Sequence, residues 1–251
     1  MTRSAIVLAG GFGTRLQKVV SELPKPMAPV AGKPFMQYVL DYLDRQGINQ
    51  TVLAVGYLRE TIIQYFGDAY NGITIKYSVE DEPLGTGGAI KQACDLVEEE
   101  NVFVINGDTF FDVDLAELFQ FHISKNAFLS VALKKMEKFD RYGTVELNHE
   151  NKITGFREKK YLDEGLINGG IYCLNKKIFP SSIPQKFSFE TEILEKEIQS
   201  GKIFGLESKG YFIVIGIPED YEIAQTDFAG FLSFRRKPFT TFRSPFVIIF
   251  L

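Results

Sequence analysis

The sequence predicts an α/β fold, in which a mixed, mostly parallel sheet is covered by helices on both faces. Up to residue 105, short apolar strands alternate with amphipathic helices, which is the pattern of consecutive β-α-β units. After residue 126 the predicted strands follow one another through short connections, which indicates antiparallel pairing. We therefore expect the second half to extend the first sheet and not to form a separate domain.

Apolar periodicity predicts each element of the first half. Ser4–Leu8 is an apolar strand bounded by glycine, and apolar residues recur at helical spacing over Phe35–Gln46 until Gly47 ends that helix. The elements that follow are a strand at Thr51–Val55, a helix at 59–67, a strand at Ile73–Ser78, a helix at Ala89–Glu99 and a strand at Val102–Ile105.

The second half is predicted to consist mainly of strands. Asp114 precedes it as the expected N-cap of a helix. The strands are Leu129–Leu133, Gly143–Leu147, Ile153–Glu158, Gly169–Leu174, 203–207 and 211–215, with one helix around residues 190–200.

Composition excludes several classes of protein. Of the 251 residues, 45 % are apolar and 24 % are charged, which is typical of a globular protein. The net charge is −4, and residues 1–230 contain no basic stripe, which argues against a nucleic-acid partner. Cys94 and Cys173 form no CxxC pair and are expected to be buried, reduced thiols of a cytoplasmic protein. No signal peptide or transmembrane segment is recognised.

Residues 231–251 differ in composition from the rest of the chain. They hold 4 of the 28 basic residues and none of the 32 acidic ones, so residues 1–230 carry a net charge of −8. We predict one domain over residues 1–230 and an atypical basic and aromatic tail over 231–251. This tail is expected to be docked or partly disordered, or alternatively to form a patch for self-association or for a membrane surface.

The stretch "IVLAGGFGTRLQ", residues 6–17, predicts a phosphate-binding loop. Ligands of open α/β sheets bind at the carboxyl ends of the strands, where this loop follows the first strand. Gly10, Gly11 and Gly13 allow backbone N–H groups to approach an anion, and Arg15 adds a fixed positive charge. The GxGxxG dinucleotide fingerprint lacks its third glycine, and no Gly-Lys-Ser/Thr of a P-loop follows. Further along, two prolines stiffen the backbone around Lys25, as suits a lysine that must reach one phosphate.

The run of motifs resembles the sugar nucleotidyltransferases, or nucleotide-diphospho-sugar pyrophosphorylases, over about residues 3–225. "LAGGFGTRL" and "PKPM" are followed in the family's order by "PLGTGGA" at 83–89, "NGDTFF" at 106–111, "FREKK" at 156–160 and "NGGIY" at 168–172. The resemblance implies the Rossmann-like nucleotide-diphospho-sugar transferase fold. It also implies that a nucleoside triphosphate and a sugar 1-phosphate react to give a nucleotide sugar and pyrophosphate.

Three stretches resemble the branch of this family that uses GTP and D-glycero-D-manno-heptose 1-phosphate. They are "FDRYGTVE" at 139–146, "INGGIY" at 167–172 and "KFSFE" at 186–190. The product would then feed surface-polysaccharide or S-layer glycan assembly. A mannose- or glucose-1-phosphate nucleotidyltransferase is the alternative within the family, and self-association into a homo-oligomer is compatible with the same resemblance.

The resemblance also assigns the site residues. Arg15, Lys25 and Asp108 would be catalytic, and Asp108 would bind Mg²⁺, a cation that prefers carboxylate oxygen. Glu80 would accept hydrogen bonds from guanine, or alternatively be a solvated residue of the "EDE" run. Residues 85–87 are expected to form a loop along the base and ribose. The nucleotide set is Leu8, Gly10, Gly11, Gly13, Thr14, Glu80, Gly85 and Thr86. The sugar-phosphate set is Tyr142, Gly143, Glu158, Lys159, Asn168 and Gly169, with an exposed charged turn as the alternative for "REKK" at 157–160.

One position departs from the family pattern. The family has a second metal aspartate in a motif like Asp-(Ile/Thr)-Gly-x-Pro, and here the matching stretch "YFIVIGIPEDY" holds Val214 in its place. Three consequences are open: Asp108, phosphates and water hold the ion, or Glu219 or Asp220 substitutes, or the chain is a catalytically silent nucleotide-sugar-binding relative.

Overall fold

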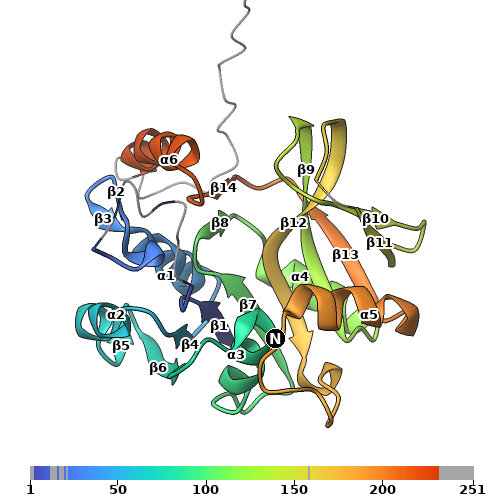
Figure 1. Cartoon of the computed structure of the whole chain (residues 1–251), viewed down its shortest axis with the longest axis horizontal. Coiled ribbons are helices and arrows are strands. Elements are labelled where there is room, and N and C mark those ends of the chain that lie inside the picture. Colours follow the sequence, from blue (N-terminus) through green and yellow to red (C-terminus); the bar gives the residue numbers. More distant parts are fainter. Residues whose placement is uncertain (1–2, 12–15, 17–19, 21, 158, 232–251) are drawn as a thin grey trace, which may run out of the picture.

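A large mixed sheet forms the centre of the molecule (Figure 1). The computed structural model describes residues 3–11, 16, 20, 22–157 and 159–231, so residues 232–251 of the predicted tail lie outside the described residues. The parallel centre of the sheet consists, in spatial order, of β7 (Asn101–Asn106), β1 (Ser4–Leu8), β4 (Gln50–Val55) and β6 (Ile73–Val79), and the short β5 (Ala69–Tyr70) lies antiparallel at its edge.

The second half of the chain extends this sheet, as predicted. β12 (Leu162–Asn175) lies antiparallel beside β7, with Ile171 opposite Ile105. Around β12 lie β9 (Leu129–Phe139), β10 (Thr144–Leu147), β11 (Ile153–Arg157) and β13 (Ile203–Ser208), which pairs in parallel with β9.

Helices cover both faces of the sheet, because both faces are apolar. Along β1, Ala5 and Val7 belong to one buried cluster, whereas Ile6 belongs to the other. The first cluster is packed by α1 (Phe35–Arg45), α2 (Arg59–Phe66), α4 (Leu115–Ser124) and α6 (Pro218–Phe231), and the second by α3 (Gly85–Cys94). None of the described helices is long and apolar enough to span a membrane. Cys94 and Cys173 are buried and free, as predicted.

Several predicted elements are wrong in their bounds or their place. The strands expected at Leu129–Leu133 and Gly169–Leu174 are longer, since they are β9, which ends at Phe139, and β12, which begins at Leu162. The helix expected at Ala89–Glu99 is α3, which begins at Gly85 and ends at Cys94. It ends early because the N–H groups that follow donate to carbonyls three residues earlier, as in a 3₁₀ turn, and not four residues earlier. The Val97 N–H, for example, donates to the Cys94 carbonyl at 3.3 Å. The strand expected at 211–215 is β14 (Phe212–Val214), which pairs with β8 (Thr109–Phe111) in a separate two-stranded sheet and does not extend the main one.

Other elements were only partly predicted. Asp114 is the predicted N-cap, and its side chain accepts hydrogen bonds from the N–H groups of Ala116 and Glu117 at 2.9 and 3.0 Å. The predicted helix around 190–200 is a π turn at Glu190–Leu194, followed by α5 (Glu195–Glu197) and a 3₁₀ turn at Ile198–Ser200. A further 3₁₀ turn covers Lys176–Ile178, and the hairpin strands β2 (Pro29–Val30) and β3 (Lys33–Pro34) were not predicted.

His122 of α4 is buried inside a polar contact network. Only 1 % of it is exposed, and burial lowers its pKa to about 4. Nε2 lies 3.2 Å from Asn101 Oδ1, which also accepts from Asn175 Nδ2 at 2.9 Å, so Nε2 is the donor of a neutral ring. Nδ1 lies 3.0 Å from Ser130 Oγ and accepts a hydrogen bond from the hydroxyl group.

The burial of neutral His122 is expected to make folding sensitive to acid. Below pH 6.5, the ordinary pKa of histidine, His122 is protonated in the unfolded chain but stays neutral in the folded chain. The free energy of unfolding therefore falls as the pH drops from about 6.5 towards 4. This contribution amounts to about 2 kcal/mol between pH 7 and pH 5. Urea unfolding of the parent and of His122→Gln at both pH values tests it, because the variant lacks this loss. An equal loss in both proteins would contradict the prediction.

Candidate active site

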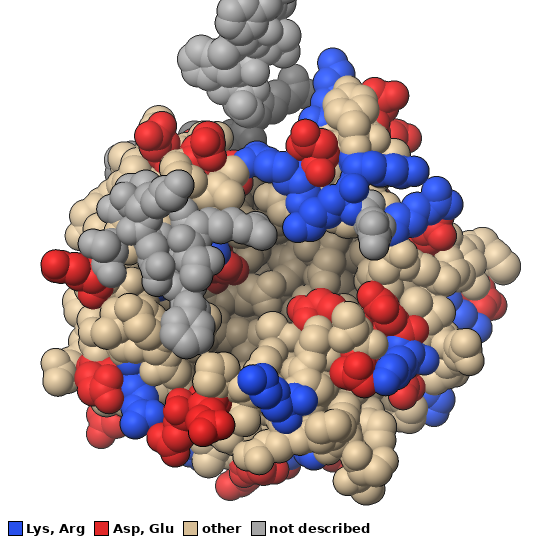
Figure 2. All heavy atoms as spheres, in the orientation of Figure 1, with Lys and Arg blue, Asp and Glu red and all other residues tan. Residues whose placement is uncertain are grey.

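Four residues of the candidate site follow the four parallel strands at their carboxyl ends. Gly10 lies beyond β1, Gly56 beyond β4, Glu80 beyond β6 and Asp108 beyond β7. Because the strands are parallel, these ends meet at one edge of the sheet, where open α/β folds bind their ligands. Figure 2 shows this face of the molecule hollowed at its centre, with Lys and Arg side chains gathered along its upper rim.

Lys25 and Asp108, which are far apart in the sequence, form an ion pair. Lys25 starts a 3₁₀ turn (Lys25–Met27) whose Pro26 and Met27 are buried, so the turn is anchored to the core. Its Nζ donates to Asp108 Oδ2 at 2.5 Å, and the two side chains are only 15 % and 33 % exposed. Thr109 Oγ1 donates to the other carboxylate oxygen at 3.1 Å. Two of the three predicted catalytic residues are thus brought together.

Val214 lies beside this ion pair. In the β14–β8 pairing it is opposite Thr109, and the next N–H group, of Ile215, donates to the Asp108 carbonyl at 2.9 Å. A Cβ placed on Gly216 would lie 3.4 Å from both Lys25 Nζ and Val214 Cγ1, so the ammonium and the methyl group flank that glycine. An apolar side chain therefore occupies the position where a second carboxylate would face the pair.

The acidic side chains around the pair fit a divalent cation only in part. The described residues hold no group of three or more His, Cys, Asp or Glu side chains arranged to bind a metal. Asp220 Oδ1 accepts a hydrogen bond from Arg141 at 3.1 Å. The pKa of Tyr142 is raised mainly by burial of its hydroxyl group and further by the negative charge of Asp220. Asp220 is therefore engaged towards the β9–β10 connection. A single carboxylate with substrate phosphates and water suits Mg²⁺, whereas the described residues form no metal cage of their own.

Glu80 is half-buried, which contradicts its interpretation as a solvated residue of an acidic run. Its Oε2 accepts from the Leu84 N–H at 3.0 Å. A Cβ on Gly10 would lie 2.6 Å from Oε1, so the glycine makes room for the carboxylate. Burial raises the pKa of Glu80, and the Leu84 N–H partly opposes that shift.

Residues 85–87 form the first turn of α3 and not the predicted loop. The reason is the close approach of the segment around Phe187. A Cβ on Gly87 would lie 2.1 Å from the Phe187 ring, and a Cβ on Gly85 would lie 2.5 Å from the Phe187 carbonyl oxygen. Gly85 also has φ of +73°, a conformation that glycine adopts at little cost. Packing alone explains these glycines, and their nucleotide contacts stay a prediction.

The predicted sugar residues are only partly brought together. Gly143 and Asn168 line one cleft of about 200 Å³. Tyr142 packs edge-on against Phe212 near Asp220, and Lys159 is exposed. A Cβ on Gly169 would meet the Phe111 ring, so that glycine serves packing. The cleft is also lined by Thr144, Val145, Phe156, Arg157, Glu190, Leu194 and Glu195.

Several predicted site residues lie outside the residues that the structure describes. They are Gly13, Thr14, Arg15 and Glu158. Leu8 is the last residue of β1, and Gly11 is exposed just beyond it. Glu190 lines the cleft and was not among the predicted site residues, although the "KFSFE" stretch that ends in it was recognised. The alternation of buried Phe187 and Phe189 was a usable signal, because it marks an anchored segment.

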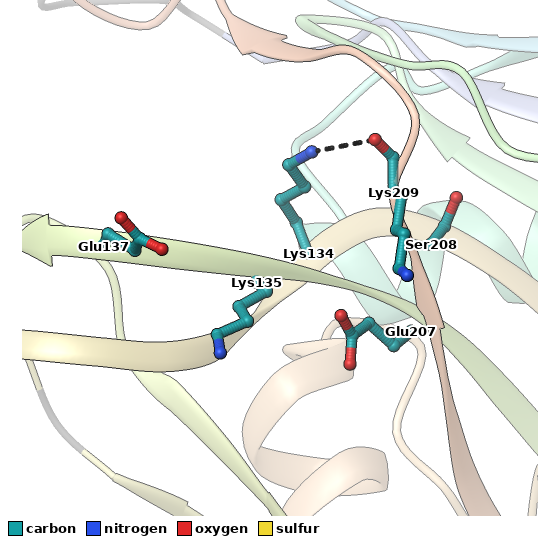
Figure 3. Close-up of a pocket in the computed structure, with 6 residues that line it drawn as sticks. All are labelled: Lys134, Lys135, Glu137, Glu207, Ser208 and Lys209. Atoms are coloured by element: carbon teal, nitrogen blue, oxygen red, sulfur yellow. Dashed lines mark hydrogen bonds between the residues drawn. The ribbon is translucent and has the colours of Figure 1, made fainter. Parts of the chain in front are cut away.

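A second concavity, of about 280 Å³, contains none of the predicted site residues (Figure 3). Two of its lysines bond to other parts of the fold. Lys134 Nζ donates to the Gly210 carbonyl at 2.7 Å and to that of Lys209 at 3.3 Å, and Lys135 pairs with Glu164 at 2.9 Å. The remaining lining residues are Glu137, Glu207 and Ser208.

Comparison with known proteins agrees with this architecture. The model of the family described as "Nucleotidyl transferase" matches residues 4–227. The D-glycero-alpha-D-manno-heptose 1-phosphate guanylyltransferase of Aneurinibacillus thermoaerophilus is 55 % identical over 224 residues, covering 89 % of this chain and 97 % of that one. The Campylobacter jejuni enzyme of the same name is 49 % identical over 218 residues, covering 86 % and 96 %. The crystal structure of HddC from Yersinia pseudotuberculosis complexed with GMP-PN is 36 % identical, with a TM-score of 0.80 and coverage of 90 % and 100 %.

Proposed function

Because the chain belongs to the nucleotidyl transferase family, we propose that it transfers a guanylyl group from GTP to D-glycero-α-D-manno-heptose 1-phosphate, with release of pyrophosphate. The names of two relatives, 55 % and 49 % identical over nearly their whole lengths, support this choice of substrates. The geometric observation that carries the proposal is the Lys25–Asp108 pair at the carboxyl edge of the parallel strands. It sets a cation and a carboxylate where two phosphate groups would meet.

The reaction needs no nucleophile from the protein. An oxygen of the sugar phosphate attacks the α-phosphorus of GTP and forms the new P–O bond. The bond between the α-phosphorus and the bridging oxygen breaks, and pyrophosphate leaves with that electron pair. Catalysis is then positioning and charge neutralisation, in which the Lys25 ammonium offsets the negative charge of the two approaching phosphates. Its low exposure strengthens that effect.

Divalent metals are in general use among nucleotidyltransferases of this family. We infer that Asp108 would be the carboxylate that holds Mg²⁺, together with nucleotide phosphates and water. The bound ion would neutralise charge that develops at the α-phosphorus. The Thr109 hydroxyl orients the carboxylate by donating to Oδ1 at 3.1 Å.

The remaining residues keep their proposed roles. The Glu80 carboxylate would accept hydrogen bonds from the N1–H and amino groups of guanine, while the Leu84 N–H bond to Oε2 orients it. The triphosphate would be held by Gly10, Gly11, Gly13, Thr14 and Arg15, next to Leu8, and the base and ribose would contact Gly85 and Thr86. The sugar phosphate would be held by Tyr142, Gly143, Glu158, Lys159, Asn168 and Gly169.

A catalytically silent nucleotide-sugar-binding protein is the second candidate, and Val214 is the observation that favours it. Pyrophosphate release from GTP, Mg²⁺ and the heptose 1-phosphate separates the two. We expect release by the parent protein, above that with mannose 1-phosphate or glucose 1-phosphate. Absence of turnover with all three sugars, combined with calorimetric binding of the GDP-heptose product, would support the silent alternative.

A further inference from the structure

Glu190 is carried into the cleft by an anchored segment. Phe187 and Phe189 are buried, and the backbone of Phe187 bonds to α3 in both directions. Its N–H donates to the Leu84 carbonyl at 2.9 Å, and its carbonyl accepts from Gly87 at 3.0 Å. The residue after this anchor therefore has a defined place between the helix that follows Glu80 and the cleft that Gly143 and Asn168 line.

The Glu190 carboxylate is held through one oxygen only. Oε2 accepts from the Thr86 hydroxyl at 2.7 Å and from the Ser188 hydroxyl at 2.9 Å. No donor from the described residues reaches Oε1. The carboxylate is therefore oriented in advance, with one acceptor oxygen left for a ligand, which reduces the entropy lost when a ligand binds.

Two other polar side chains of the cleft, Arg157 and Asn168, are already engaged. Arg157 is paired with Glu146. The Asn168 amide donates to the Tyr172 hydroxyl at 2.8 Å, and its oxygen accepts from the Gly170 N–H at 3.0 Å. Glu195 also lines the cleft, but no hydrogen bond from the described residues holds its carboxylate. A sugar is rich in hydroxyl donors, and Glu190 supplies an oriented acceptor for them.

We propose that Glu190 is a sugar-specificity residue, whose Oε1 accepts a hydrogen bond from a hydroxyl group of the acceptor sugar 1-phosphate. This inference rests on the proposed function, since it names a contact of the same reaction. It also connects the two substrates through one carboxylate, because Oε2 is bound to α3 on the nucleotide side.

Calorimetric titration of the heptose 1-phosphate into protein loaded with Mg²⁺ and a non-hydrolysable GTP analogue tests this assignment. In Glu190→Gln the acceptor becomes an amide, and we expect the sugar Kd to rise about 10-fold or more, as for loss of a hydrogen bond to a charged group. The Kd of the GTP analogue is expected to stay within about twofold, because Thr86 and Ser188 still find an acceptor.

Two matched variants separate sugar binding from a structural role. Glu192→Gln changes the same residue type on the same turn, where the carboxylate pairs with Lys196, and we expect the parent's sugar Kd. Ser188→Ala removes a donor to Oε2 but leaves Oε1, so a rise of less than about threefold is expected.

The outcomes distinguish this assignment from the proposed function. A parent protein that binds the sugar, together with an equal sugar Kd in Glu190→Gln, would overturn the role of Glu190 alone. Equal losses in Glu190→Gln and Ser188→Ala, with lowered thermal stability in both, would assign Glu190 a purely structural role and overturn the proposal as well. A parent that neither binds nor converts the heptose 1-phosphate would overturn the proposed function and this contact with it.

Discussion

Replacement of Asp108 by Asn is expected to lower kcat by about 10²- to 10³-fold. The change removes the carboxylate that pairs with Lys25 at 2.5 Å and that we propose as the protein ligand of Mg²⁺. Losing both contacts at the reacting phosphates removes several kcal/mol of transition-state stabilisation, of which about 1.4 kcal/mol corresponds to each tenfold in rate. Pyrophosphate release at saturating GTP and heptose 1-phosphate measures the effect.

Asp114→Asn is the matched control for this change. It converts the same side chain on the same stretch of chain, and Asn is as good an N-cap as Asp, so α4 keeps its start. We expect parental activity and stability from the control. An Asp108→Asn protein that retains more than about a tenth of the parental kcat would contradict the assigned role, because its loss would then be below one tenfold step.

Local pattern and family motifs predicted those parts of the molecule that depend on nearby residues. Ser4–Leu8 was predicted with its observed bounds, because a buried parallel strand is a continuous apolar run that glycine ends. The resemblance placed Lys25 and Asp108 in one site, and the two side chains form an ion pair across 83 residues of sequence, while their catalytic roles stay a prediction.

The sequence did not reveal contacts that depend on packing between distant segments. Glu190 and Thr86 are 104 residues apart, and no local period indicates that they share a hydrogen bond. The start of α3 was misplaced for a related reason, since glycines that look like a loop allow the backbone of Phe187 to approach the helix. Misplacing β14 had a similar cause, because a three-residue strand carries no sign of its partner.

Replacement of Val214 by Asp is expected to raise kcat by about 10²-fold. The new carboxylate would lie beside Lys25 and Asp108, next to Gly216, and would give the cation a second protein ligand. Mg²⁺ is commonly bound by one or two carboxylates together with substrate phosphates. A second carboxylate would hold the ion more firmly at the position where it neutralises negative charge in the transition state. Pyrophosphate release by parent and variant under identical conditions measures the gain.

The same change has a consequence that does not depend on turnover. Without a divalent cation, two carboxylates near one ammonium repel each other, so Val214→Asp is expected to unfold at a lower temperature than the parent in EDTA. Addition of Mg²⁺ and a GTP analogue should reverse that difference, because the ion then binds the variant more tightly. Val214→Asn is the control, since it adds polarity and similar volume without charge. If Val214→Asn gains as much activity, the gain does not come from a metal ligand. If the parent is active and Val214→Asp gains neither activity nor cation-dependent stability, Asp108 alone is sufficient and the valine is compatible with full catalysis.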